Sequence, residues 1–186
     1  MSQQLRIVAV VGSLRRDSYT RRIASALRVL APSTMSIEIM SVGSLPLYNE
    51  DDDHDEPPQE WRSFRAQLRA ADAVLFATPE YNRSIPGGMK NAIDVGSRPY
   101  GSSVWSGKPA AVLGVSPGSL GAFGANHHLR QCLTFLDMPV LQQPEAYLGR
   151  VADVVDDCGR ITQPETQEYL RTFMGAFEQW IRRVRR

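Results

Sequence analysis

Three short apolar runs set the strongest limit on how this chain can fold. They are Leu5–Val11 (LRIVAVV), Ala73–Thr78 (AVLFAT) and residues 109–115 (PAAVLGV). Each is rich in aliphatic side chains and has glycine or proline within the two residues that follow it. Runs of this length, bounded by turn residues, are typical of strands buried on both faces of a parallel sheet. The chain is therefore expected to form a central sheet covered by helices.

Segments with helical spacing separate these runs. Ile23, Leu27 and Leu30 recur three or four residues apart, as do Trp61, Phe64 and Leu68 in a later segment. The predicted strands cover residues 5–11, 36–42, 73–78, 109–115 and 140–141. The predicted helices cover residues 19–30, 58–71, 86–98, 125–136 and 164–185.

Strict alternation of strand and helix indicates an α/β fold with helices on both faces of a parallel sheet. Five strands suit a flavodoxin-like three-layer α/β/α sandwich with strand order 2-1-3-4-5. The 186 residues contain no linker, internal repeat or low-complexity tract, so we expect a single domain over residues 1–186.

Composition favours a cytoplasmic protein. The net charge of +1 does not predict a nucleic-acid partner, and the N-terminal apolar run is too short for a signal segment or a membrane span. Cys132 and Cys158 form no CxxC motif and no metal-type spacing, so both are expected to be free thiols. No metal site is predicted. The acidic run 50–56 is interpreted as a solvated loop rather than a cation site, because it lacks EF-hand spacing.

Three unusual loops follow the first, third and fourth strands. They are residues 12–20 (GSLRRDSYT), 79–88 (PEYNRSIPGG) and 116–124 (SPGSLGAFG). Ligands of open parallel sheets bind beyond the carboxyl ends of the strands, so these loops should form one site. His127 and His128 begin the helix after the third loop, and we expect them on the helix surface or at an interface.

The first loop has the chemistry of a phosphate cradle. It leads into a helix, whose free N–H groups favour an anion, and Ser13, Ser18 and Thr20 add hydroxyl donors. Arg15 adds a planar guanidinium that matches phosphate oxygens. Neither a Walker A loop nor a GxGxxG motif is present. The equally open alternative is that Ser18 is simply the N-cap of the helix.

The other two loops offer little for acid–base or nucleophilic catalysis, since only Glu80 and Tyr81 titrate. Their proline and glycine residues instead hold open turns, whose backbone groups can meet the polar edge of a flat heterocycle. Redox chemistry on a bound cofactor needs no protein acid or base, so no catalytic side chain is predicted.

Together, the first loop and the block PEYNRSIPGGMKNAID (residues 79–94) resemble the NADPH-dependent FMN reductase family, in particular its bacterial chromate and quinone reductases. The resemblance covers nearly the whole chain. Two positions depart from the family pattern: Thr20 stands where asparagine is usual, and Val95 where tryptophan is frequent. The first keeps a hydrogen-bond donor, whereas the second is expected to loosen packing near a subunit interface.

The resemblance implies that FMN lies across the three loops, with its phosphate at the first loop and its ring system between the other two. The residues implied in binding are Ser13, Arg15, Ser18, Tyr19, Thr20, Pro79, Glu80, Tyr81, Asn82, Ser84, Ser116, Gly118, Ser119 and Gly121. It also implies a homodimer or homotetramer.

The implied reaction passes hydride from NADPH or NADH to FMN and then electrons to a small-molecule acceptor. Quinones, chromate, azo compounds and free flavin all remain open as acceptors. The alternatives are a flavodoxin-type electron carrier and a flavin-binding module with little turnover. Carriers of that type tend to be strongly acidic, which this chain is not.

Overall fold

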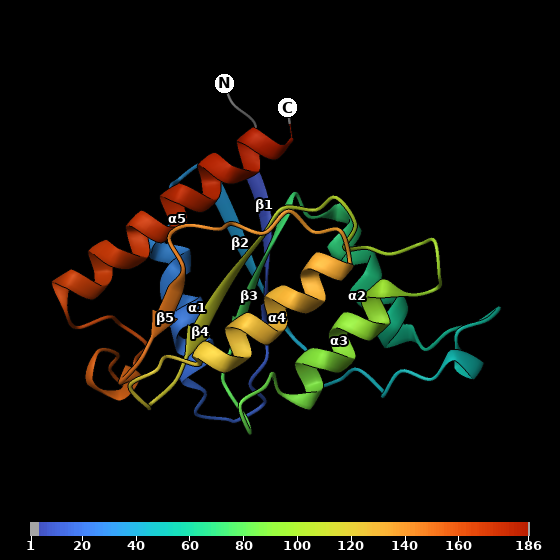
Figure 1. The fold of residues 1–186 in the computed structure, drawn as a ribbon, viewed down its shortest axis with the longest axis horizontal. Helices are drawn as coiled ribbons and strands as arrows, with labels where there is room; N and C mark the ends of the chain where they lie inside the picture. The colour runs from blue at the N-terminus through green and yellow to red at the C-terminus, as the bar shows by residue number, and fades with distance from the viewer. Residues whose placement is uncertain (1–3, 186) are drawn as a thin grey trace.

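A five-stranded parallel sheet forms the centre of the computed structural model, which describes residues 4–185 (Figure 1). The strand order is β2-β1-β3-β4-β5, as predicted. The strands are β1 (Leu5–Val11), β2 (Met35–Ser41), β3 (Ala73–Thr78), β4 (Ala110–Val115) and β5 (Ala146–Leu148). The predicted domain also includes residues 1–3 and residue 186, which lie outside the described residues.

The helices form two layers, one on each face of the sheet. They are α1 (Tyr19–Leu30), α2 (Gln59–Ala70), α3 (Gly87–Ser97), α4 (Phe123–Phe135) and α5 (Pro164–Val184). Helices α1 and α5 cover one face, and α2, α3 and α4 cover the other (Figure 1). The three-layer sandwich predicted from the alternating pattern is therefore confirmed.

Alternate strand residues supply the two cores. Ile7 and Leu75 pack toward α1 and α5, whereas Val8 and Phe76 pack toward α2, α3 and α4. Successive strand side chains point to opposite faces, so a strand covered on both sides must be apolar throughout. Every residue of β3 and β4 is buried, which explains their unbroken apolar runs.

The fifth strand lies later in the chain than predicted. Val140 makes only an isolated parallel bridge with Ala110, and the paired strand is β5, whose residues align with Leu113–Val115. Pro144 separates the two stretches and has no N–H to donate to a sheet. The prediction of a strand at 140–141 was wrong because a three-residue strand preceded by proline carries almost no sequence signal.

Gly121 illustrates how closely the third loop approaches the sheet. Its φ of +59° lies in the left-handed region, and a Cβ there would lie 2.8 Å from the carbonyl carbon of Tyr147. Both the conformation and the space therefore require glycine. Gly175 in α5 is a useful contrast, since a Cβ at that position would meet nothing within 4 Å.

We expect Gly121→Ala to lower the free energy of unfolding by about 2–3 kcal/mol, because alanine adds left-handed strain and a backbone clash. Gly175→Ala should raise it by about 0.5–1 kcal/mol, since alanine favours the helix. Urea denaturation of both variants measures the two effects. Equal stability of Gly121→Ala and the wild type would show that the loop does not pack as described.

Candidate functional site

The carboxyl ends of β1, β3 and β4 lie at one edge of the sheet, at the bottom of Figure 1, and the three predicted loops meet there. A cavity of about 360 Å³ opens between the first loop and the second loop with the start of α3. Its walls are formed by Gly12, Leu14, Arg15, Tyr81, Pro86, Gly87 and Gly88. The structure therefore brings the first two loops together, as predicted.

Ser18 lies at the N-terminus of α1 and caps it. The backbone N–H of Arg21 donates to Oγ of Ser18 at 3.1 Å. This bond uses a lone pair of Oγ and leaves the hydroxyl hydrogen available to a ligand. Ser13 and Thr20 are also buried, and Arg15 is exposed at the cavity wall. Ser18 can therefore cap α1 and still donate a hydrogen bond to a phosphate.

The second loop is a two-residue hairpin. Tyr81 and Ser84 exchange two backbone hydrogen bonds of 3.0 and 2.9 Å. Asn82 and Arg83 between them have φ values of 51° and 62°. Two successive positive φ values define the tight turn that joins strands most directly, and only asparagine of the two residues favours this region. The turn holds Tyr81 at the cavity with about half of its surface exposed.

Two side chains tie this hairpin to α4. Oε2 of Glu80 accepts a hydrogen bond of 3.0 Å from the backbone N–H of Ala125, and Oγ of Ser84 lies 2.6 Å from Nδ1 of His128. A carboxylate at the positive end of a helix is electrostatically favoured. The Glu80 carboxylate satisfies an N–H in the first turn of α4, which is consistent with a helix that begins at Phe123, two residues earlier than predicted. The Glu80 carboxylate is therefore directed at a helix, which leaves its backbone for a ligand.

The third loop is held by its own polar groups. The N–H of Gly118 donates to Oγ of Ser116 at 3.0 Å, and the N–H of Ser116 donates to the carbonyl of Leu148 at 3.0 Å. Gly118 and Ser119 remain exposed. The loop therefore presents backbone groups and one hydroxyl at the edge of the sheet, without an acid–base pair.

One carboxylate of the acidic run belongs to the protein interior, contrary to the expectation of a wholly solvated loop. Asp53 is buried and receives two hydrogen bonds, of 2.7 and 2.6 Å, from the guanidinium of Arg65. Nε of Arg65 donates to the carbonyl of Val95 at 2.8 Å. Val95 is itself fully buried. The pair fastens the acidic segment to α2 and α3.

Elsewhere in the acidic run, Asp51, Asp52 and Asp55 are exposed. Over residues 4–185, no group of three or more metal-type ligands converges on one point. Within the same range, no helix combines the length and apolar character needed to cross a bilayer.

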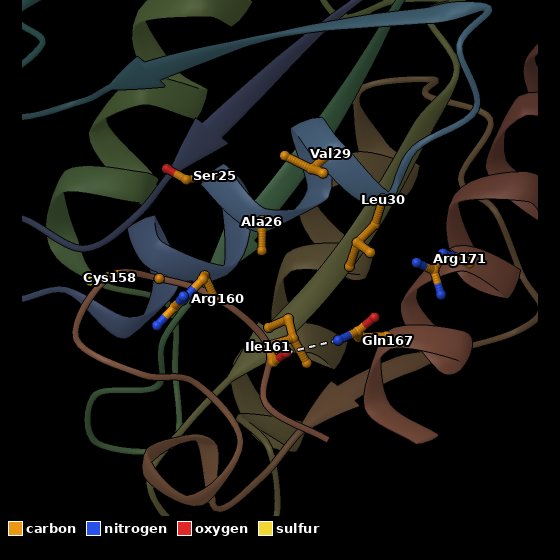
Figure 2. A pocket seen from close by; sticks show the side chains of 10 residues that line it. Ser25, Ala26, Val29, Leu30, Cys158, Arg160, Ile161, Gln167 and Arg171 are labelled. Carbon is orange, nitrogen blue, oxygen red and sulfur yellow. Dashed lines mark hydrogen bonds between the residues drawn. The ribbon is translucent and has the colours of Figure 1, made fainter. Parts of the chain in front are cut away.

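A second pocket, of about 340 Å³, lies between the end of α1 and the start of α5 (Figure 2). Val29 and Leu30 of α1 line it, opposite Arg160, Ile161 and Arg171. Of the site residues predicted from the sequence, all of which are described, none lines this pocket. It has no connection with the three loops, so we assign the functional site to the sheet edge.

The site fits FMN in its donor chemistry. At one end, the first loop carries a guanidinium at the cavity and leads into the N-terminus of α1, which are groups that suit a phosphate. The hydroxyl residues Ser13, Ser18 and Thr20 are buried and do not line the cavity. At the other end, the hairpin and the two glycines that begin α3 provide backbone and an aromatic side chain for a flat ring. The fold is that of the flavodoxin-like proteins, and the donor groups at this end of the sheet are compatible with a flavin mononucleotide.

Comparison with known proteins identifies the family. Residues 5–153 match the family model of the NADPH-dependent FMN reductases. A quinone reductase of Pseudomonas putida is 56% identical over 98% of this chain and 97% of its own. An NAD(P)H-dependent FMN reductase of Pseudomonas aeruginosa is 43% identical over the full length of both chains.

Solved structures agree with this result. FerB, a flavoenzyme NAD(P)H:acceptor oxidoreductase of Paracoccus denitrificans, has a TM-score of 0.90 and 38% identity, and the match covers 97% of this chain and 98% of FerB. The chain therefore belongs to the NADPH-dependent FMN reductase family. It is an oxidoreductase whose cofactor is FMN and whose reductant is NAD(P)H.

Sequence reasoning missed the residues that support the loops from outside. His127 and His128 are exposed on α4, in agreement with the expectation of a helix surface or interface, but the contact of His128 with Ser84, forty-four residues away, was not predicted. Leu14, Gly87 and Gly88 line the cavity but were not singled out. Their positions inside the two matching motifs were the available signal.

The pKa of Asp53 is held below its usual range by the hydrogen bonds from Arg65, which outweigh the opposing effect of burial. A carboxyl whose pKa is lower in the folded state stabilises the fold above its unfolded pKa, about 3.9, and loses this contribution as pH falls through the folded value. Asp53→Asn should therefore cost about 3–5 kcal/mol of unfolding free energy at neutral pH, because it leaves Arg65 buried without its carboxylate.

The measurement is denaturant unfolding of the wild type and Asp53→Asn between pH 7 and pH 3. The difference between them should narrow as pH falls below about 4. Asp55→Asn, at an exposed neighbouring position, serves as the control and should stay within about 0.5 kcal/mol of the wild type. A constant difference across the pH range would contradict the ionic role of Asp53.

Proposed function

We propose that the three loops hold FMN with its phosphate at the N-terminus of α1. Ser13, Arg15, Ser18 and Thr20 bind the phosphate, and Tyr19 packs beside it. The ring and ribityl chain lie against Pro79, Glu80, Tyr81, Asn82 and Ser84 on one side and Ser116, Gly118, Ser119 and Gly121 on the other. The observation that carries this proposal is the cavity between the first two loops, which Arg15 lines from one loop and Tyr81 from the other. The first of these loops leads into the N-terminus of α1.

FMN supplies the redox chemistry, since it accepts hydride from NAD(P)H and passes electrons to an acceptor. The chain's own residues bind and orient. Tyr81 and the Gly87–Gly88 backbone shape an open face, at which the nicotinamide and then the acceptor bind in turn. Neither step requires a catalytic side chain, in agreement with the helix-capping role of the Glu80 carboxylate.

A quinone is the acceptor that we propose. The quinone reductase of Pseudomonas putida supports this choice through 56% identity over nearly the entire chain. Chromate, azo compounds and free flavin are the alternatives for an open site of this kind. A flavodoxin-type carrier is disfavoured by the net charge of +1, because such carriers use strong negative charge to reach their partners.

We further propose that the protein works in the cytoplasm as one FMN-binding domain over residues 1–186, assembled into a homodimer or homotetramer. A cavity of about 370 Å³ between α3 and α4 supports assembly. Phe135, the last residue of α4, and Leu136, the residue after it, add apolar surface to this cavity, and Phe135 is 87% exposed.

Anaerobic addition of NADPH to the FMN-loaded protein should bleach the visible flavin spectrum, and one equivalent of a benzoquinone should restore it. Parallel additions of chromate, an azo dye and free FMN rank the acceptors by the rate of recovery. Rapid bleaching excludes a pure electron carrier. A spectrum that NADPH leaves unchanged would contradict the reductase function, and slow recovery with benzoquinone alone would move the assignment to the fastest acceptor.

Arg15→Ala should weaken FMN binding by about 1.5–3 kcal/mol, or roughly 10- to 150-fold in Kd, since it removes a charge-assisted hydrogen bond to phosphate. Titration of the FMN-free protein, followed by flavin fluorescence, measures the change. Arg16→Ala is the matched control at an exposed neighbouring arginine and should stay within threefold of the wild type. Equal affinities of Arg15→Ala and Arg16→Ala would remove Arg15 from the phosphate site.

A further inference from the structure

The Tyr81–Ser84 hairpin is poorly held by burial. Tyr81, Asn82 and Arg83 are all exposed, and Ser84 is only partly buried. Its two internal backbone bonds close the turn but do not fix where the hairpin lies. Side-chain bonds to α4 must therefore contribute to its position over the cavity.

One of these bonds joins two side chains. Oγ of Ser84 lies 2.6 Å from Nδ1 of His128, at the short end of the range for a hydrogen bond. The other bond uses the backbone of α4, at Ala125. In that bond, the carboxylate of Glu80 accepts from the N–H of Ala125, and His128 lies about one helical turn after Ala125. The two bonds therefore hold successive parts of the hairpin.

We propose that His128 is a positioning residue for FMN, which it serves by holding Ser84 and the hairpin at the site. The inference rests on the proposed function, because Ser84 is one of the residues assigned to the flavin. Neither His128 nor Ser84 lines the cavity of the first two loops, but Tyr81 of the same hairpin does, so His128 acts by holding the hairpin through Ser84.

The contact with His128 also decides which polar group the Ser84 hydroxyl presents to a ligand. Serine has one hydrogen to donate and two lone pairs to accept with. When Nδ1 of His128 accepts, the hydrogen of Ser84 is directed at the histidine, and Ser84 offers lone pairs to a ligand. When Nδ1 carries the hydrogen, Ser84 accepts and its own hydrogen is free. His128 thus fixes both the place of Ser84 and the polar group that it presents.

His127 provides a control at the neighbouring position. Its Nε2 lies 2.9 Å from the hydroxyl of Tyr147, and its ring contacts Phe123. Successive helix residues point about 100° apart, so His127 is directed away from the hairpin. Both histidines are exposed, but only His128 lines the cavity between α3 and α4 that we propose to support assembly. The comparison therefore requires that His128→Ala and His127→Ala keep the oligomeric state of the wild type in gel filtration.

The experiment compares His128→Ala, Ser84→Ala and the double variant by FMN titration of the FMN-free protein. Each single variant should raise Kd by about three- to tenfold, the range of one hydrogen bond. The double variant should be no weaker than the worse single variant, since both remove the same interaction. His128→Asn should restore most of the affinity, because its amide group reaches the position of Nδ1, and His127→Ala should stay within twofold.

Trypsin gives a readout without flavin. Arg83 is at the exposed tip of the hairpin, and cleavage after it should become severalfold faster in His128→Ala but not in His127→Ala, as followed by mass spectrometry. Additive effects in the double variant, or unchanged cleavage after Arg83, would overturn the proposal. A wild type that fails to bind FMN would overturn the proposed function as well, whereas tight binding by both wild type and His128→Ala overturns only this inference.

Discussion

The parallel pairing of β1, β3 and β4 is the constraint on which the rest of the structure depends. Parallel strands place all their carboxyl ends at the same edge, so loops that are far apart in the sequence must meet. Burial on both faces makes this arrangement stable, because each strand contributes apolar side chains to two cores. The position of the site is thus a consequence of sheet topology and needs no special interaction between the loops.

Hydrogen bonds between side chains and the backbone then give each loop a defined shape. Ser18 caps α1, Glu80 caps α4, and Ser116 closes its own turn. Each of these bonds uses an acceptor oxygen to satisfy a backbone N–H that would otherwise lack a partner. A preorganised site of this kind loses less conformational freedom when a ligand binds. The same polar residues therefore serve the fold and the cofactor.

The chemistry of the site follows from what its side chains do. The Glu80 carboxylate bonds to the backbone of a helix, Ser18 caps a helix and Ser116 closes a turn, so the protein supplies shape and donors while FMN supplies the electron transfer. Such a division suits a reductase with an open face. It also explains why the motifs of this family carry glycine, proline and hydroxyl residues in place of a catalytic pair.

Much of this protein was determined by local sequence pattern. The pattern of apolar residues was enough for the first four strands, the helices and the three loops, because burial on both faces demands apolar strands. The strand order followed from the fold type that five alternating strands suit. Strand β5 was not predicted, because a strand of three residues is too short to show an alternating or continuous apolar pattern. The partners of Glu80, Ser84 and Asp53 were decided only by tertiary structure. A polar side chain specifies what kind of group it needs, but only the packed fold determines which distant group comes within hydrogen-bond distance.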